Sequence, residues 1–232
     1  MSERQIVLDT ETTGLEPELG HRIIEIGCVE LVDRRYTRNN FHYYLDPERE
    51  IDAAAIEVHG ITNEFLADKP KFSEIWEQLA RYLEGAELII HNAAFDVGFL
   101  DHEFARVGAD HVRVGQWCRV IDSLQLARRL HPGQKNSLDA LCKRYAIDNS
   151  QRTLHGALLD AEILADVYLA MTGGQTALNL EFGRTASPGG DEPGSTGSRR
   201  RVLELVAVAV GDDDLEAHGN WLKQLGDRSL FP

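Results

Sequence analysis

Cysteine is scarce in this sequence, and its distribution argues against two kinds of site. The 232 residues contain three cysteines, Cys28, Cys118 and Cys142. They are odd in number and widely spaced, and no Cys-x-x-Cys pair occurs, so neither a disulfide framework nor a zinc cluster is expected. We interpret them as buried free thiols in a reducing cytosol.

Long apolar runs and nucleotide-binding loops are also missing. No apolar run reaches the roughly 18 residues that a membrane-spanning helix needs. Polar residues Ser2–Gln5 lead directly into a strand-like run, so no signal peptide is expected. The absence of a Gly-x₄-Gly-Lys-Ser/Thr motif excludes a P-loop. With 43% hydrophobic and 27% charged residues, the chain has the composition of a soluble globular protein.

Positive charge is the third deficit. Lys and Arg total 24 against 38 Asp and Glu, which gives a formal net charge of −14. A protein that held nucleic acid by neutralising phosphates alone would normally be basic. The charge therefore argues against tight autonomous binding of nucleic acid. It leaves room for a nuclease whose bound divalent cations supply local positive charge.

The pattern of apolar residues predicts an α/β domain that ends near Met171. Strands are expected first, with a turn at 33–37, and then strand and helix alternate, which favours a mixed central sheet flanked by helices. Asn92 is a candidate N-cap for the helix that follows the fourth strand. The expected strands are 5–9, 22–32, 39–44, 86–90 and 117–121, and the expected helices are 72–83, 94–106, 122–130, 137–145 and 158–171.

The composition changes after this domain. Between Gly183 and Ser198, twelve of sixteen residues are Gly, Pro, Ser or Thr, and such a segment is typical of a flexible linker. A strand-like run at 202–210 and a helix capped by Asp212–Asp214 follow, ending near Gln224. About 30 residues are too few for an independent core. We therefore expect a docking element that folds on a partner.

Two acidic residues stand at the end of the first strand. Asp9 and Glu11 are separated by one residue, so their side chains project from the same face of the strand. Their repulsion costs free energy unless a cation lies between them. A solvated strand end would give the same pair, but Gly14 just beyond it lets a ligand approach the backbone closely.

Further ionisable residues fall at comparable positions in the predicted fold. Asp96 lies in the first turns of the helix after strand 86–90, at the same edge of the sheet. His155 and Asp160 are five residues apart, which on a continuous helix is about 140° and points them in different directions. The two side chains converge if His155 lies in the loop that enters the helix, and Gly156 favours such a break. A surface histidine and a helix-start aspartate are the alternatives.

Together these residues fit phosphodiester hydrolysis. Four carboxylates can hold two hard divalent cations, Mg²⁺ or Mn²⁺. Two cations roughly 3.5–4 Å apart stabilise the attacking and the leaving oxygen. A histidine that titrates near neutrality can take the proton of the attacking water.

At this point the sequence resembles a known family. Asp9-x-Glu11, Asp96 and His155-x₄-Asp160 are similar to the ordered motifs of the DEDDh 3′→5′ exonucleases, over roughly residues 4–172. The resemblance implies a ribonuclease-H-like fold, two divalent cations and release of nucleoside 5′-monophosphates from a 3′ end. It further implies that Asp9, Glu11, Asp96 and Asp160 bind metal and that His155 is the general base.

The same resemblance suggests which residues contact the substrate. His59 would contact the terminal nucleotide, with Thr12, Asn92 and Phe95 lining the same pocket and Asp9, Glu11 and Asp160 reaching the substrate through the metal site. A loop-packing role for His59 and a core role for Phe95 stay open. Some relatives carry an acidic residue five positions before the histidine of the His-Gly-Ile-Thr motif; here that position is Ala54, and no role is carried over.

Within the family, the chain resembles the proofreading, epsilon, subunits of bacterial DNA polymerase III. The resemblance rests on Val58–Thr62, Leu154–Ala161 and Met171–Thr176. It implies proofreading of nascent DNA in the bacterial cytoplasm, at the nucleoid-associated replisome.

This subfamily resemblance also suggests partners for the rest of the chain. Residues 175–180 are similar to sliding-clamp-binding peptides, with Gln175 in a polar subsite and Leu178 and Leu180 in an apolar pocket. A remnant of a helix end is the alternative. The tail resembles the segment that docks on the alpha, polymerase, subunit, and such tethering would compensate for the acidic charge. The expected organisation is an exonuclease domain at 1–172, a clamp-binding peptide at 173–182, a linker at 183–201 and a polymerase-docking tail at 202–232.

Two other functions remain open from the residues. An RNA-trimming DEDDh exonuclease would share the catalytic set and differ in contacts to the 2′-hydroxyl. A non-enzymatic scaffold with a decayed site is disfavoured, because all four acids and the histidine are present.

Overall fold

The computed structural model describes residues 4–109, 111–152 and 154–173 of the chain. Residues 174–182 of the predicted clamp-binding peptide, with Gln175, Leu178 and Leu180, lie outside the described residues, as do the linker and the docking tail. Among the described residues, no helix has the length and apolar character needed to cross a bilayer.

A six-stranded mixed sheet forms the centre of the domain. Its strands are β1 (Arg4–Thr12), β2 (Ile23–Val32), β3 (Arg35–Tyr36), β4 (Phe41–Tyr44), β5 (Glu87–Ile90) and β6 (Arg119–Asp122). The main order is β3-β2-β1-β5-β6, and β4 also pairs with β2. The first four strands pair antiparallel, whereas β5 and β6 run parallel to β1. The predicted mixed sheet is therefore confirmed.

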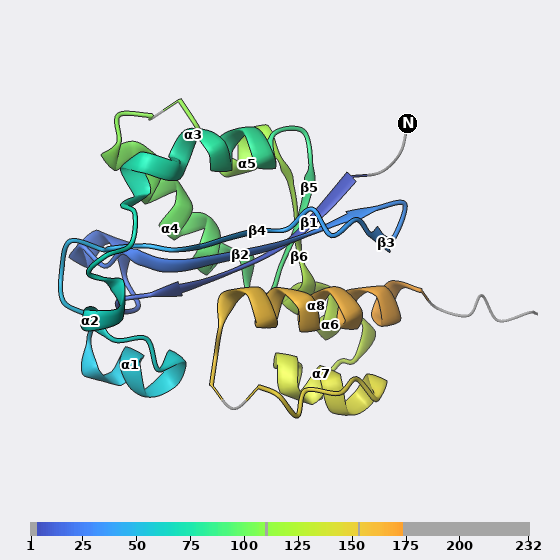
Figure 1. Cartoon of the computed structure of the whole chain (residues 1–232). Coiled ribbons are helices and arrows are strands. Elements are labelled where there is room, and N and C mark those ends of the chain that lie inside the picture. Colours follow the sequence, from blue (N-terminus) through green and yellow to red (C-terminus); the bar gives the residue numbers. More distant parts are fainter. Residues whose placement is uncertain (1–3, 110, 153, 174–232) are drawn as a thin grey trace, which may run out of the picture. The chain divides into compact units, whose positions relative to one another are not determined.

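Helices cover both faces of this sheet (Figure 1). One face carries α3 (Phe72–Leu83), α4 (Ala93–Arg106) and α5 (Val114–Trp117), and the other carries α6 (Ser123–Leu130), α7 (Leu138–Tyr145) and α8 (Ala157–Thr172). The short helices η1 (Pro17–Leu19), α1 (Ala53–His59) and α2 (Asn63–Leu66) lie in the connections. The alternation of strand and helix in the second half of the chain produces this three-layer arrangement.

The core follows the two-residue period of β1. Ile6 and Leu8 pack in the cluster that includes Phe72 and Phe99 of α3 and α4. Val7 faces the opposite way, in the cluster with residues of α6, α7 and α8. Because successive strand residues alternate between faces, Asp9 and Glu11 continue the Val7 face toward α8, and Thr10 continues the face toward α4.

The structure corrects three local predictions. Residues 35–36 within the expected turn form β3, since they pair with Leu31 and Val32. Trp117 ends the short helix α5 instead of starting a strand, and β6 begins at Arg119. Asn92 does occupy the N-cap position of α4, but its backbone is left-handed and its side chain makes no capping hydrogen bond.

Candidate active site

The acidic pair at the end of β1 is enclosed by other carboxylates. Burial, followed by the negative charges of Asp96 and Glu11, raises the pKa of Asp9 well above its usual value. Burial and the charges of Asp160 and Glu25 raise the pKa of Glu11 to about 8. The expected repulsion between acidic side chains is thus present, and a bound cation would relieve it.

Asp96 joins this group from the opposite layer. It lies in the first turn of α4 and is buried, and its Oδ1 accepts a hydrogen bond of 2.7 Å from the Thr10 hydroxyl. Burial raises the pKa of Asp96 to about 7, although the hydrogen bonds oppose this rise. Thr10 points toward α4, whereas Asp9 and Glu11 point toward α8. Strand β1 therefore contacts acidic residues on both faces of the sheet.

His155 lies in the loop before α8, as predicted. Gly156 is the N-cap of the helix, and Asp160 lies in its first turn. The backbone N–H of His155 donates to the carbonyl of Val58 at 3.2 Å. This bond ties the loop to the end of α1.

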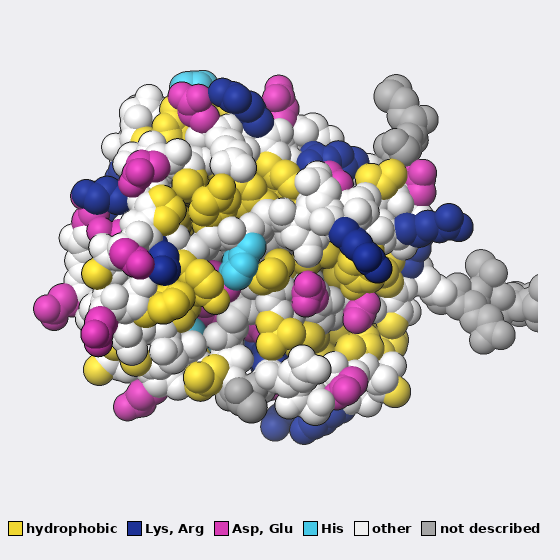
Figure 2. Space-filling view, viewed as in Figure 1, with side chains coloured by type: hydrophobic (Ala, Val, Ile, Leu, Met, Phe, Trp, Pro, Cys, Tyr) yellow, Lys and Arg dark blue, Asp and Glu magenta, His cyan; other side chains and the backbone are white. Residues whose placement is uncertain are grey.

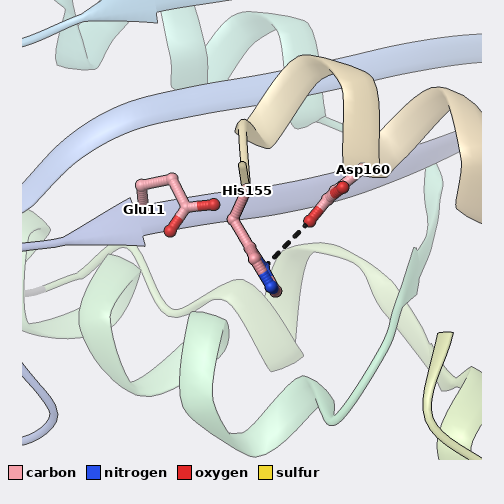
Figure 3. A group of neighbouring side chains, drawn as sticks. All are labelled: Glu11, His155 and Asp160. Atoms are coloured by element: carbon pink, nitrogen blue, oxygen red, sulfur yellow. Dashed lines mark ion pairs between the residues drawn. The ribbon is translucent and has the colours of Figure 1, made fainter. Parts of the chain in front are cut away.

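The loop conformation brings the histidine to the carboxylates. The distance from His155 Nδ1 to Asp160 Oδ2 is 3.3 Å. Ligand atoms of Glu11, His155 and Asp160 all lie within 4.8 Å of one another, and His155 stands between the two carboxylates (Figure 3). On a continuous helix the side chains of His155 and Asp160 would point in different directions. They meet here because α8 starts after His155.

Close packing of α8 on β2 sets this geometry. A Cβ placed on Gly27 would lie 2.2 Å from the backbone nitrogen of Leu158 and 2.3 Å from the carbonyl carbon of Ala157. Only a glycine therefore allows the first turn of α8 to sit against the sheet at this point. The same turn carries Asp160, so Gly27 helps to place the carboxylate opposite β1.

A cleft of about 810 Å³ opens over these residues, and most of the predicted site residues line it. Arg128 is also part of its wall. The lining includes Asp9, Glu11, Asn92, Phe95, Asp96, Asp139, Arg152, His155 and Asp160. A cleft of this size accommodates a nucleotide-sized ligand.

Two predicted substrate contacts, Thr12 and His59, are not among the lining residues. The Thr12 hydroxyl donates to the carbonyl of Gly14 at 2.6 Å. His59 is buried, and its Nδ1 accepts from the N–H of Ile61 at 3.0 Å. Burial, with a smaller contribution from His155, lowers the pKa of His59. The interaction with His155 indicates that His59 lies close to the site although it does not line the cleft.

The structure adds Arg152, which the sequence reasoning missed. Its guanidinium contacts both oxygens of Asp160, with Nε–Oδ1 at 2.5 Å and Nη2–Oδ2 at 2.7 Å. It also contacts Asp139 Oδ1 at 2.9 Å and His155 Nδ1 at 2.9 Å. A basic residue three positions before the catalytic histidine candidate was the available signal.

Glu25 is a second addition. It pairs with Glu11 across the β1–β2 ladder and is buried. Its Oε1 lies 2.8 Å from His42 Nε2. This buried carboxylate adds to the negative potential of the site, and its charge helps to raise the pKa of Glu11. Its position within an apolar strand run concealed it in the sequence.

These observations fit a site for divalent cations. Burial and the negative charges of neighbouring carboxylates raise the pKa values of Asp9 and Glu11, and hard cations prefer such oxygen ligands. On the face drawn in Figure 2, the Lys and Arg side chains of the described residues lie in separate groups, and apolar side chains gather across the middle. A broad basic surface for nucleic acid is not present on that face.

Comparison with known proteins gives consistent results. The family model described as Exonuclease matches residues 6–168. The DNA polymerase III subunit epsilon of Escherichia coli (strain K12) is 54% identical over 222 residues, which covers 93% of this chain and 90% of that protein. The subunit of the same name from Pasteurella multocida (strain Pm70) is 52% identical, covering 97% and 90%.

Solved structures share the fold. Exonuclease X in complex with 5′ overhanging duplex DNA is 30% identical, with a TM-score of 0.57 over 73% of this chain and 91% of that chain. The nuclease domain of 3′hExo, a DEDDh family member bound to rAMP, is 18% identical, with a TM-score of 0.62 over 73% and 92%. The second likeness supports the ribonuclease-H-like fold alone.

Proposed function

The chain belongs to the exonuclease family and, within it, to the DNA polymerase III epsilon subunits; from this premise we propose which residues perform its reaction. The protein is a proofreading 3′→5′ exonuclease of DNA polymerase III. Family membership also implies dependence on divalent metal. The predicted enzyme class and fold are thereby confirmed.

The acidic side chains around the end of β1 form the proposed metal site. Asp9, Glu11, Asp96 and Asp160 would hold two divalent cations, Mg²⁺ or Mn²⁺, and these would stabilise negative charge on the attacking and leaving oxygens. The observation that carries the assignment is the convergence of β1, α4 and α8, which brings these carboxylates into one cleft, where burial and neighbouring negative charges raise the pKa values of Asp9 and Glu11.

His155 is the proposed general base. Its side chain is 46% exposed, so it can accept a proton from water and return it to solvent. The terminal nucleotide would lie in the cleft beside Asn92 and Phe95. His59 and Thr12 would help to orient that nucleotide. The effect of His155 on the pKa of His59 supports this role, because it indicates that the two rings are close to each other.

We also propose the finer partner assignments. Residues 175–180 would bind the sliding clamp through Gln175, Leu178 and Leu180, and the tail at 202–232 would bind the polymerase, alpha, subunit. Linker 183–201 would join them, and the assembly would work in the cytoplasm at the nucleoid. The net charge of −14 supports this arrangement, since tethering replaces intrinsic affinity for DNA with a high local concentration of 3′ ends.

One assay tests this proposal. The purified chain is incubated with 3′-labelled DNA carrying matched or mismatched ends, and with RNA, with and without Mg²⁺. Metal-dependent release of nucleoside monophosphates from DNA is expected, with preference for the frayed mismatched end. Glu11→Gln should lower the rate roughly 10²-fold or more, as loss of one group that stabilises transition-state charge does, and the exposed Glu84→Gln is the control. Faster trimming of RNA than of DNA would contradict the substrate assignment.

A further inference from the structure

Arg152 is the most highly connected cation of the active-site cleft among the described residues. Its side chain is 9% exposed although it lies on the loop between α7 and α8. Its three nitrogens contact Asp160, Asp139 and His155, at the four distances of 2.5–2.9 Å given above. An arginine in a bidentate pair with a carboxylate makes one of the strongest side-chain contacts available to a protein.

The position of this pair conflicts with the metal site. Nε and Nη2 of Arg152 occupy one oxygen each of Asp160. A divalent cation bound to Asp160 would need lone pairs of the same carboxylate and would add positive charge beside the guanidinium. The arginine and the cation therefore compete for the same negative charge.

We propose that Arg152 is an internal counter-ion, which neutralises Asp160 in the metal-free enzyme and is displaced from it when a divalent cation binds. This inference rests on the proposed metal site. The guanidinium keeps a partner after displacement, because Nη1 is bonded to Asp139 at 2.9 Å and the side chain of Asp139 is half exposed at the rim. Asp139 thus holds Arg152 in the cleft in both states.

His155 connects the displacement of Arg152 by the cation to the proposed reaction. An arginine can only donate hydrogen bonds, so Nδ1 of His155 must accept the bond from Nη2 of Arg152. That ring nitrogen is then not available to another donor. When Arg152 leaves Asp160, Nδ1 is released as well. Arg152 is accordingly a positioning residue, which keeps the acid and the base paired until the cation arrives.

A purely structural role for Arg152 predicts a different result. If the guanidinium served only to fasten the 146–156 loop and to hold Asp160 in place for the metal, its loss would weaken metal binding. Loss of the guanidinium would also lower the free energy of unfolding equally with and without metal. The sign of the change in metal affinity therefore separates the two roles.

The test uses the full chain and Mn²⁺ as the probe. Mn²⁺ binding is measured by titration calorimetry, and melting temperatures are measured in EDTA and in saturating Mn²⁺. The variants are Arg152→Gln, which removes the charge, and Arg152→Lys, which keeps the charge but cannot span both carboxylate oxygens. Arg128→Gln is the matched control, since Arg128 lines the same cleft whereas the guanidinium that pairs with Asp160 is that of Arg152. Asp160→Asn removes a proposed metal ligand and shows the Mn²⁺ affinity that remains when the site itself is lost.

Arg152→Gln should bind Mn²⁺ about tenfold more tightly than the parent, the order expected when one charge-assisted pair no longer has to be broken. Its melting temperature should fall in EDTA and return close to the parent's in Mn²⁺. Arg152→Lys should lie between the two. Arg128→Gln should change affinity less than about twofold, because the cation breaks no charge-assisted pair of Arg128 when it binds Asp160.

Weaker or equal Mn²⁺ binding by both Arg152→Gln and Arg152→Lys would overturn the role of Arg152 while leaving the metal site intact. A parent chain that binds no Mn²⁺, or an Asp160→Asn variant that binds it normally, would remove the proposed metal site and the inference with it. If Arg152→Gln does not fold, the Arg152→Lys affinity decides, because that variant keeps the positive charge on the loop.

Discussion

Individual carboxylates make the metal-free protein sensitive to pH. The pKa values of Glu11 and Asp96 are raised to about 8 and about 7. A carboxyl group with a raised pKa binds its proton more tightly in the folded state than in the unfolded chain. The free energy of unfolding therefore falls as the pH rises from the ordinary value near 4 to the raised value.

We expect the melting temperature in EDTA to decrease between pH 5 and pH 8, and to decrease much less in saturating Mg²⁺. The cation holds the carboxylates ionised, so few protons are released on unfolding. Burial lowers the pKa values of His59 and His91, so their titration raises stability as the pH rises, with or without Mg²⁺. Their contribution cancels when the melting temperatures in EDTA and in Mg²⁺ are subtracted at each pH. Parallel pH profiles with and without Mg²⁺ would contradict the prediction.

His155 allows its role as base to be separated from a role as metal ligand. Its ring lies close enough to Glu11 and Asp160 to share a cation with them, yet we propose that it transfers a proton. His155→Ala should lower turnover by roughly 10²–10⁴, the usual contribution of a general base, and should leave the Mn²⁺ affinity nearly unchanged. Calorimetry and turnover at saturating Mn²⁺ measure the two effects. A variant that loses affinity but keeps turnover would make His155 a ligand instead.

Helices and strands were predictable where the apolar period is long enough to be read. The helix at 72–83 has the same bounds in the structure, because Phe72, Ile75, Leu79 and Leu83 all face the core. The helices α1, α2 and α5 are four to seven residues long. They were missed, since fewer than two turns do not establish a helical period.

The residues of the site were likewise only partly predictable from the sequence. The acids and the histidine stand at element ends, where topology brings them together, so their meeting could be anticipated from the order of strands and helices. Arg152 and Glu25 act through side-chain contacts between separate elements, such as Arg152 in the loop before α8 with Asp139 of α7. Such pairs leave no periodic signal. The contact between Thr10 and Asp96 was hidden for the same reason.

The packing of α8 on β2 predicts a large effect from a small substitution. Gly27→Ala would place a methyl group 2.2–2.4 Å from backbone atoms of Ala157 and Leu158, so the helix must shift away from the sheet. Overpacking of this kind costs roughly 1–3 kcal/mol or more. The shift should also lower exonuclease activity, because α8 carries Asp160.

Gly98 in α4 is the matched control, since a Cβ there would have no neighbour within 4 Å. Gly98→Ala should stabilise the protein by about 0.5–1 kcal/mol through the higher helix propensity of alanine. Denaturant unfolding and the rate on single-stranded DNA measure both variants. A Gly27→Ala variant as stable and as active as Gly98→Ala would show that the close packing does not set the site.

The molecule as a whole joins an acidic catalytic domain to a segment of different composition. All the proposed catalytic residues lie before Met171, and the Gly-, Pro-, Ser- and Thr-rich stretch follows. A chain that ends at Phe182 should therefore keep its melting temperature and its rate on free single-stranded DNA. It should no longer co-elute with the polymerase subunit, because the proposed docking tail is gone.

Proofreading in the reconstituted polymerase distinguishes tethering from catalysis. In the chain ending at Phe182, excision depends on free diffusion to the 3′ end, so misincorporation should rise although the intrinsic rate is unchanged. A full chain with Gln175, Leu178 and Leu180 replaced by Ala is the matched variant, and it should lose clamp binding while keeping the polymerase. Lengthening the linker should have little effect, because effective concentration falls slowly with length. If the truncated chain still co-elutes stoichiometrically, the polymerase must bind residues before 183, and the tail cannot be the sole tether.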